Sequence, residues 1–139
     1  MQLIPDHLVD LVTTDNVAHV TLTEADGSLV THVLWIDYDG RHLLVWSRTN
    51  SHKSRVFRAR PQVAISVVDK QNPWRRLSIT GRVTDFRPDV GHEFINKLAW
   101  RYTNSPYPRT PESEAIVITP ERVRAFNDRF SSPLEVATA

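Results

Sequence analysis

Two Asp-Gly dipeptides constrain the fold of this chain more than any other feature. Asp26-Gly27 and Asp39-Gly40 are typical of two-residue β-hairpin turns, because glycine readily adopts the positive φ that such turns require. Alternating apolar and polar residues predict a half-buried strand over 18–23. The run Leu29–Ile36 is nearly continuous and rich in β-branched residues, so we expect a strand covered on both faces, and Leu43–Trp46 forms a third strand. Together these features predict a three-stranded antiparallel meander.

The rest of the chain alternates short strands with turns and short helices. We expect further strands over 63–68, 77–86, 115–118 and 123–126, with a bulge at Gly81, and helices near 5–12, over 52–60 and from Pro88-Asp89 to about 102. Many antiparallel strands leave unpaired edges, which a closed or split barrel protects. We therefore predict a mainly β (α+β) fold, a six- to seven-stranded antiparallel split β-barrel with short flanking helices. It forms a single domain over 1–139, in which 131–139 is a flexible tail.

Composition narrows the possible partners and the location. The chain has 139 residues, 17 Lys and Arg against 16 Asp and Glu, and no cysteine. A net charge of +1 predicts no nucleic-acid or membrane partner, and the absence of cysteine excludes disulfides and thiolate ligands. No apolar run approaches the roughly 20 residues of a membrane-spanning helix, and we expect a cytoplasmic protein. The six histidines lack zinc-binding spacing, so no metal site is predicted.

The junction between the third strand and the next helix carries the strongest sign of a binding site. The helix begins after Ser51, a favourable N-cap, and cations lie in its first turns, where the helix dipole disfavours them. Free N–H groups, hydroxyl groups and cations together suit a phosphate or phosphodiester. The candidate anion ligands are Ser47, Thr49, Ser51, Lys53 and Arg55. The alternative is a solvated basic helix face.

Two further segments are candidates for contact with a planar ring. Trp74 follows Asn72-Pro73 in a loop, where it can stack on a ring or fold back onto the core, and Arg75 can pair with an anion. The backbone of Val33, Leu34 and Trp35 can line a heterocycle, although core packing alone also explains these residues.

The sequence carries no convincing acid–base machinery. It lacks the Gly-x-Ser-x-Gly elbow, both glycine-rich nucleotide motifs and any Ser/His/Asp arrangement that spacing supports. No catalytic residue is therefore named. If the protein is an enzyme, a bound cofactor performs the chemistry.

Taken together, these segments resemble the FMN-binding split β-barrel superfamily named for pyridoxamine 5'-phosphate oxidase. The likeness runs from Ile4 to Phe126, and Lys53, Arg55, Phe57 and Arg60-Pro61 match the family's phosphate-binding helix. QNPWRRLSITGRV, INKLAWRYTNSPYP and AIVITPERVRAF are similar to the branch that uses coenzyme F420, an 8-hydroxy-5-deazaflavin. The C-terminal substrate-binding extension of the vitamin B6 oxidases is missing, which argues against pyridoxamine phosphate oxidation.

The resemblance implies a homodimer with two cofactor sites at its interface. It implies that Val33, Leu34 and Trp35 line the deazaflavin ring and that Ser47, Thr49, Ser51, Lys53 and Arg55 meet the phosphate-bearing tail. Asn72, Pro73 and Trp74 would close over the ring, with Arg75 near the cofactor or its tail. The implied activity is an F420H2-dependent oxidoreductase that transfers a hydride to a small conjugated acceptor, such as a quinone, enone or tetrapyrrole. The alternatives are an FMN-dependent oxidoreductase of the same fold and a non-catalytic cofactor- or haem-binding module.

Overall fold

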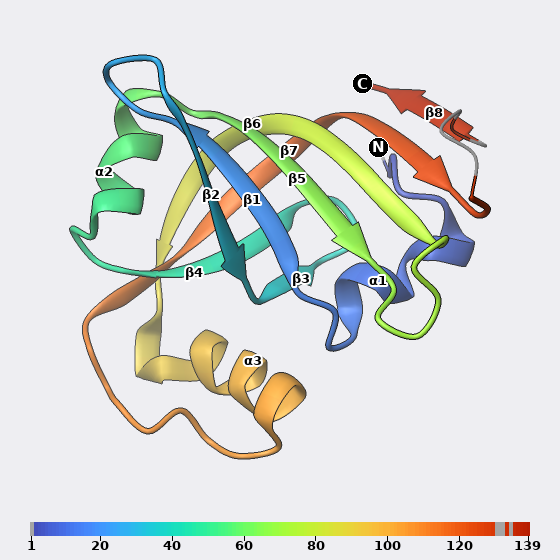
Figure 1. Ribbon diagram of the computed structural model, residues 1–139. Coiled ribbons are helices and arrows are strands. Elements are labelled where there is room, and N and C mark those ends of the chain that lie inside the picture. Colours follow the sequence, from blue (N-terminus) through green and yellow to red (C-terminus); the bar gives the residue numbers. More distant parts are fainter. Residues whose placement is uncertain (1, 130–132, 134) are drawn as a thin grey trace.

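Eight strands form one antiparallel sheet that curls into a split barrel (Figure 1). The computed structural model describes residues 2–129, 133 and 135–139. Hydrogen-bonded neighbours follow the order β2-β1-β5-β6-β7-β4-β3, and β8 pairs with β7. The strands are β1 (Ala18–Thr23), β2 (Leu29–Leu34), β3 (Ile36–Tyr38), β4 (Leu43–Arg48), β5 (Gln62–Val68), β6 (Arg76–Pro88), β7 (Ser113–Phe126) and β8 (Glu135–Thr138). The predicted fold class is confirmed, and β3 and β8 are additional short strands.

The predicted three-stranded meander is wrong. β1 pairs with β2 and β3 pairs with β4, but β2 and β3 lie at opposite ends of the hydrogen-bonded order. Only Trp35 separates them in sequence, so the apolar run 29–36 passes from one edge of the barrel to the other at this residue. The prediction that this run is covered on both faces is also wrong for the single chain. Leu29 is 72% and Val33 60% exposed, because alternate β2 side chains point away from the core.

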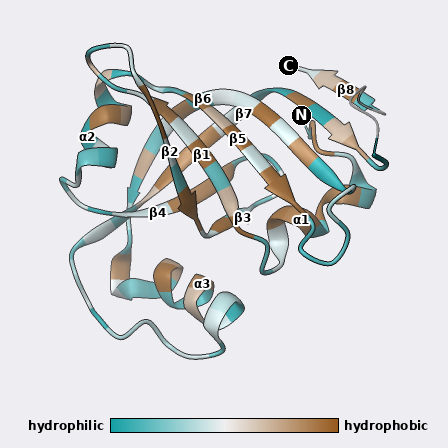
Figure 2. Cartoon of the chain, in the orientation of Figure 1, coloured by the Kyte–Doolittle hydropathy of each residue, from teal (hydrophilic) through white to brown (hydrophobic). Residues whose placement is uncertain are grey.

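The barrel interior is filled by the inward-facing side chains of these strands. Alternation is clearest in β5, where Val63, Ile65 and Val67 are buried and their neighbours are exposed or half-buried. Two short N-terminal helices, η1 (Asp6–Leu8) and α1 (Asp10–Thr13), add Leu8, Leu11 and Val12 to the same core. Figure 2 shows the result, with apolar colours along the strands and polar colours on the connecting turns.

The longest strand pair is bent at a bulge, as predicted for Gly81. The register of β6 against β7 shifts between Thr80 and Gly81, and Gly81 lies opposite Pro120. A Cβ atom at Gly81 would lie 2.5 Å from the carbonyl oxygen of Thr119, closer than real contacts allow. Pro120 is tolerated here because the irregular ladder does not require its missing N–H. The two strands predicted around Pro120 are therefore the single strand β7.

The two longer helices pack at one end of the barrel (Figure 1). α2 (His52–Ala59) has the predicted start, and the Ser51 hydroxyl accepts a hydrogen bond from the Ser54 amide. α3 (Glu93–Thr103) begins later than predicted, after the turn η2 (Val90–His92). The Asp89 carboxylate accepts hydrogen bonds from the amides of Phe94 and Ile95 at 2.8 and 3.0 Å, which fixes the start of α3.

The C-terminal segment differs from the flexible tail predicted over 131–139. Glu135–Thr138 form β8, which pairs with residues 122–125 of β7. Residues 131, 132 and 134 lie outside the described residues. Among the described helices, none has the length and apolar character that crossing a membrane requires.

Candidate ring- and anion-binding site

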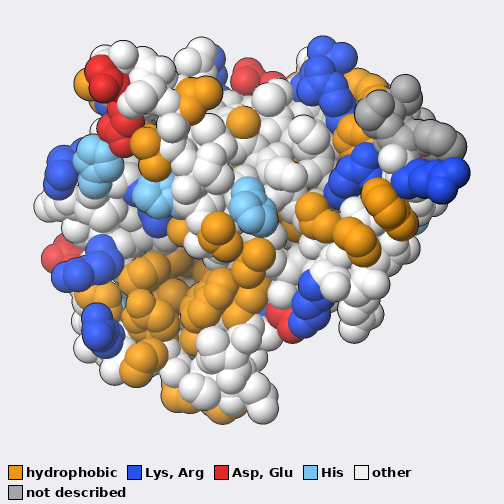
Figure 3. Space-filling model, viewed as in Figure 1, with side chains coloured by type: hydrophobic (Ala, Val, Ile, Leu, Met, Phe, Trp, Pro, Cys, Tyr) orange, Lys and Arg blue, Asp and Glu red, His pale blue; other side chains and the backbone are white. Residues whose placement is uncertain are grey.

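A cavity of about 280 Å³ opens between the end of β2, the strand β4 and the helices α2 and α3. In Figure 3, apolar side chains gather on this face between the two helices, with cationic side chains at the margin. The cavity is lined by Val33, Leu34, Trp35, Trp46, Lys53, Ile95 and Tyr107. The structure therefore brings four predicted site residues together: Val33, Leu34, Trp35 and Lys53.

Aromatic rings make up one wall of the cavity. Trp35 stacks on Tyr102 with ring centroids 5.3 Å apart and planes within 6° of parallel, while Trp46 lies 5.2 Å from Tyr107. Tyr102 is itself anchored, because its hydroxyl donates to the Asn16 carbonyl at 2.6 Å. Such fixed, flat side chains suit a planar ligand.

Tyr107 brings the 104–112 loop to the cavity. The Tyr107 amide donates to the Asn96 side-chain carbonyl at 2.9 Å, so α3 holds the loop in place. Trp46, Ile95 and Tyr107 line the cavity but were not among the predicted site residues. Their sequence signal was present, since Trp46 opens the predicted anion-binding stretch and Tyr107 lies in the family-like segment INKLAWRYTNSPYP.

Lys53 is a cation without a counter-ion at the edge of this apolar cavity. Within the described part of the chain, its ammonium group has neither a carboxylate partner nor a hydrogen-bond acceptor. Burial lowers the pKa of Lys53 below its ordinary value, because the charged form loses hydration. A partly buried cation left in this state favours an anionic ligand.

Ser47 and Ser51, which were predicted to bind the anion, form hydrogen bonds within the protein instead. Ser47 is fully buried, and its hydroxyl lies 2.6 Å from that of Ser51 and accepts from Ser54 at 2.9 Å. Ser51 in turn caps α2. These two serines therefore position the helix that carries Lys53 and do not line the cavity.

Thr49 and Arg55 also lie away from the cavity. Thr49 borders a different hollow beside Glu112 and Ser113. Arg55 is exposed, and its guanidinium donates to the carbonyl of Asn50. With 3.6 residues per helical turn, Arg55 lies on the side of α2 opposite to Lys53, because it follows Lys53 by two residues. Within one chain, Lys53 alone of the five predicted anion ligands lines the cavity.

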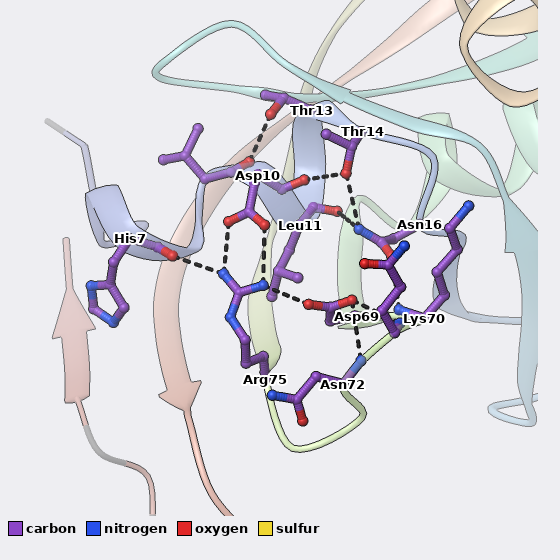
Figure 4. Close-up of polar contacts among 12 residues, drawn as sticks. His7, Asp10, Leu11, Thr13, Thr14, Asn16, Asp69, Lys70, Asn72 and Arg75 are labelled. Carbon is purple, nitrogen blue, oxygen red and sulfur yellow. Dashed lines mark hydrogen bonds and ion pairs between the residues drawn. The ribbon is translucent and has the colours of Figure 1, made fainter.

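The loop with Asn72, Pro73 and Trp74 lies at the other end of the barrel, beside α1 (Figure 1). Arg75 holds this loop against the N-terminal helices, as Figure 4 shows. The Arg75 guanidinium donates to Asp10 at 2.8 Å, to Asp69 at 2.5 Å and to the His7 carbonyl at 2.9 Å. Hydrogen bonds from Arg75 to Asp10 and Asp69 raise the pKa of Arg75. Trp74 does not fold back onto the core, since it is 51% exposed.

Two buried polar atoms near the cavity lack partners among the described residues. They are the indole nitrogen Nε1 of Trp46, which lines the cavity, and the imidazole nitrogen Nε2 of His32 on β2. Burying a donor without an acceptor costs roughly 1–3 kcal/mol, so such atoms mark places where a ligand supplies the partner. Flat aromatic walls, an unpaired indole N–H and an unpaired ammonium group together fit a planar, oxygen-bearing ring with an anionic tail. The described residues contain no cluster of three side chains suited to hold a metal ion.

A sequence model of one family matches almost the whole chain. That family is described as pyridoxamine 5'-phosphate oxidase, and the match covers residues 4–127. The chain belongs to this family. The resemblance of the sequence to the split-barrel superfamily is thereby confirmed.

Solved structures of similar fold support the same assignment. A structure named F420 reductase is 31% identical, covers 86% of this chain and 98% of its own, and superposes with a TM-score of 0.78. General Stress Protein 26 from Bacillus anthracis str. Sterne is 14% identical, with 95% of each chain covered and a TM-score of 0.70. HupZ from Group A Streptococcus is 16% identical, with 94% and 98% covered and a TM-score of 0.67. The last two show the fold alone, and no curated protein matches the chain.

Proposed function

We propose that the protein is an F420H2-dependent reductase that transfers a hydride to a small conjugated acceptor. The observation that carries this proposal is Lys53, an unpaired cation at the end of an aromatic cavity, in a chain 31% identical to a structure named F420 reductase. F420 combines a flat ring with an anionic tail, which is the combination that the cavity suits. When bound, the reduced deazaflavin supplies the hydride from its C5.

The side chains around the cavity would bind and orient both reactants. Lys53 would hold the anionic tail, and the backbone of Val33 and Leu34 would run along the ring. Trp46 Nε1–H would donate to a ring oxygen, which relieves its missing hydrogen bond. The stacked Trp35 and the loop residue Tyr107 would exclude water from the reacting faces. Positioning of this kind lowers the barrier without a protein acid or base.

We further propose that each site is completed by a second copy of the chain. Leu29 and Val33 leave an apolar face on β2 that a partner would cover. The loop 72–74 lies at the far end of the barrel from the cavity of its own chain, so its Trp74 is available to close the cavity of the other subunit. A homodimer with two such interface sites accounts for both observations.

Purification from a host that lacks F420 tests the cofactor proposal against its closest alternative. FMN also joins a flat ring to a phosphate, so Lys53 suits it as well. A colourless preparation that quenches the fluorescence of added F420 supports the proposal. A yellow preparation that retains flavin and ignores F420 identifies an FMN enzyme instead.

Steady-state turnover separates a reductase from a cofactor carrier. With a panel of quinones, enones and a tetrapyrrole, the reductase consumes many equivalents of F420H2. A carrier binds F420H2 but reduces no acceptor beyond one equivalent. Sedimentation velocity tests the dimer, and a stable monomer at micromolar concentration contradicts the interface site.

A further inference from the structure

His32 lies on β2, two residues before Leu34, which lines the cavity together with Lys53. Alternation along β2 places His32 on the same face as Val30 and Leu34, which pack against the core. Its Nε2 atom is buried and has no partner in the described part of the chain.

Three titratable groups act on His32 without forming a hydrogen bond to its Nε2. They are Lys53 and His52 on α2, and Glu24 just after β1. Glu24 is occupied by His52, whose Nε2 lies 2.8 Å from the carboxylate. Burial lowers the pKa of His32, and the charge of Lys53 lowers it further, against a smaller opposing effect of Glu24. The imidazole is therefore neutral near pH 7 in the free protein.

We propose that His32 is a second ligand of the anion held by Lys53, and that it takes up one proton from solvent when the anion binds. The identity of the anion, the phosphodiester tail of F420, rests on the proposed function. An anion beside Lys53 offsets the repulsion that Lys53 adds to the effect of burial on His32, and it offers an acceptor to a protonated Nε2. Protonation makes both ring nitrogens N–H donors, so the orphan atom and the unpaired cation are satisfied together.

This coupling makes anion affinity depend on pH in a defined direction. The complex binds one proton more than the free protein at pH values between the His32 pKa of the free protein and the higher pKa of the complex. Within that window, affinity rises as pH falls. Below the free-protein pKa both states are protonated, and above the pKa of the complex both are neutral, so the dependence vanishes at either side.

Isothermal titration calorimetry with F420, in two buffers of different ionisation enthalpy, measures the proton uptake directly. F420 has titratable groups of its own, so the readout is the difference between the wild type and His32→Gln, whose amide can donate but cannot titrate. We expect uptake by the wild type to exceed that of the variant at pH 6.5–7. Between pH 8 and 6, the wild-type dissociation constant should fall about three- to tenfold more than that of His32→Gln.

Another histidine variant serves as a matched control. His42 lies in the β3–β4 turn beside Asp39, so His42→Gln should keep the uptake of the wild type. Tight F420 binding with equal uptake in wild type and His32→Gln overturns the role of His32 and leaves the proposed function intact. If F420 does not bind, the proposed function fails. The same wild-type and His32→Gln comparison with FMN, which also carries a phosphate, then decides the role of His32.

Discussion

Replacement of Lys53 by methionine should weaken cofactor binding without weakening the fold. Lys53 has no ion-pair partner among the described residues, and burial lowers its pKa, so its charge contributes no stability to the free protein. Methionine keeps the length of the side chain and removes the charge. We therefore expect the free energy of unfolding of Lys53→Met to equal or exceed that of the wild type.

The expected loss of affinity follows from the single charge-assisted contact that Lys53 would make with the cofactor tail. Such a contact contributes about 1.5–3 kcal/mol. Since 1.4 kcal/mol corresponds to a tenfold change, the dissociation constant for F420 should rise about ten- to a hundredfold. Fluorescence titration at low and high salt measures it, and added salt should weaken the wild type more than the variant.

Arg41→Met provides the control for this experiment. Arg41 is exposed in the β3–β4 turn and does not line the cavity, so its replacement should leave F420 affinity unchanged. Equal dissociation constants for the wild type and Lys53→Met would refute the assignment of Lys53 to the anion. A large loss of stability in Lys53→Met would refute the claim that its charge is unsatisfied in the free protein.

Two further substitutions test the scaffold of the site. Gly81→Ala places a Cβ 2.5 Å from the Thr119 carbonyl oxygen, so we expect a loss of about 1–3 kcal/mol in denaturant unfolding, and an unchanged midpoint would contradict the bulge geometry. The Asp37 carboxylate joins β3 to α3 by accepting from Lys97 and Arg101 at 2.7 and 2.9 Å. Asp37→Asn removes the charge and one of the two acceptor oxygens, and should cost about 1.5–3 kcal/mol at pH 7. Burial raises the pKa of Asp37, but hydrogen bonds from Lys97 and Arg101 outweigh it and lower the pKa below the ordinary value. The stability advantage of the wild type over Asp37→Asn should therefore shrink as the pH falls below about 3.9 and through the lowered pKa of Asp37. An equal difference in free energy of unfolding at pH 7 and pH 3 would contradict the ion pair.

Features set by local chemistry were predictable from the sequence. The cap at Ser51, the bulge at Gly81 and the alternation over 18–23 each depend on a few neighbouring residues, and the structure has all three. Lys53 was also found by a local argument, since a cation at a helix start is unusual and the structure places it in the cavity.

Features set by long-range packing were not predictable in the same way. The sequence cannot reveal that the chain leaves one edge of the sheet and joins the other at Trp35, because the pairing of β2 and β3 depends on the other strands. It also cannot show that the Ser47 hydroxyl forms a hydrogen bond with Ser51, the N-cap of α2. Nor can it show that the loop with Asn72 lies far from Lys53. Both depend on which side chains meet after folding.

Isotope transfer tests the central claim most directly. F420H2 carrying two deuterium atoms at C5 is incubated in ordinary water with the wild-type protein and the best enone acceptor, and the product is analysed by mass spectrometry. An enone that receives the hydride at carbon should carry one deuterium per molecule, over many turnovers. Release of the label to water, or no reduction of any acceptor despite F420H2 binding, would contradict the account of this protein as a reductase.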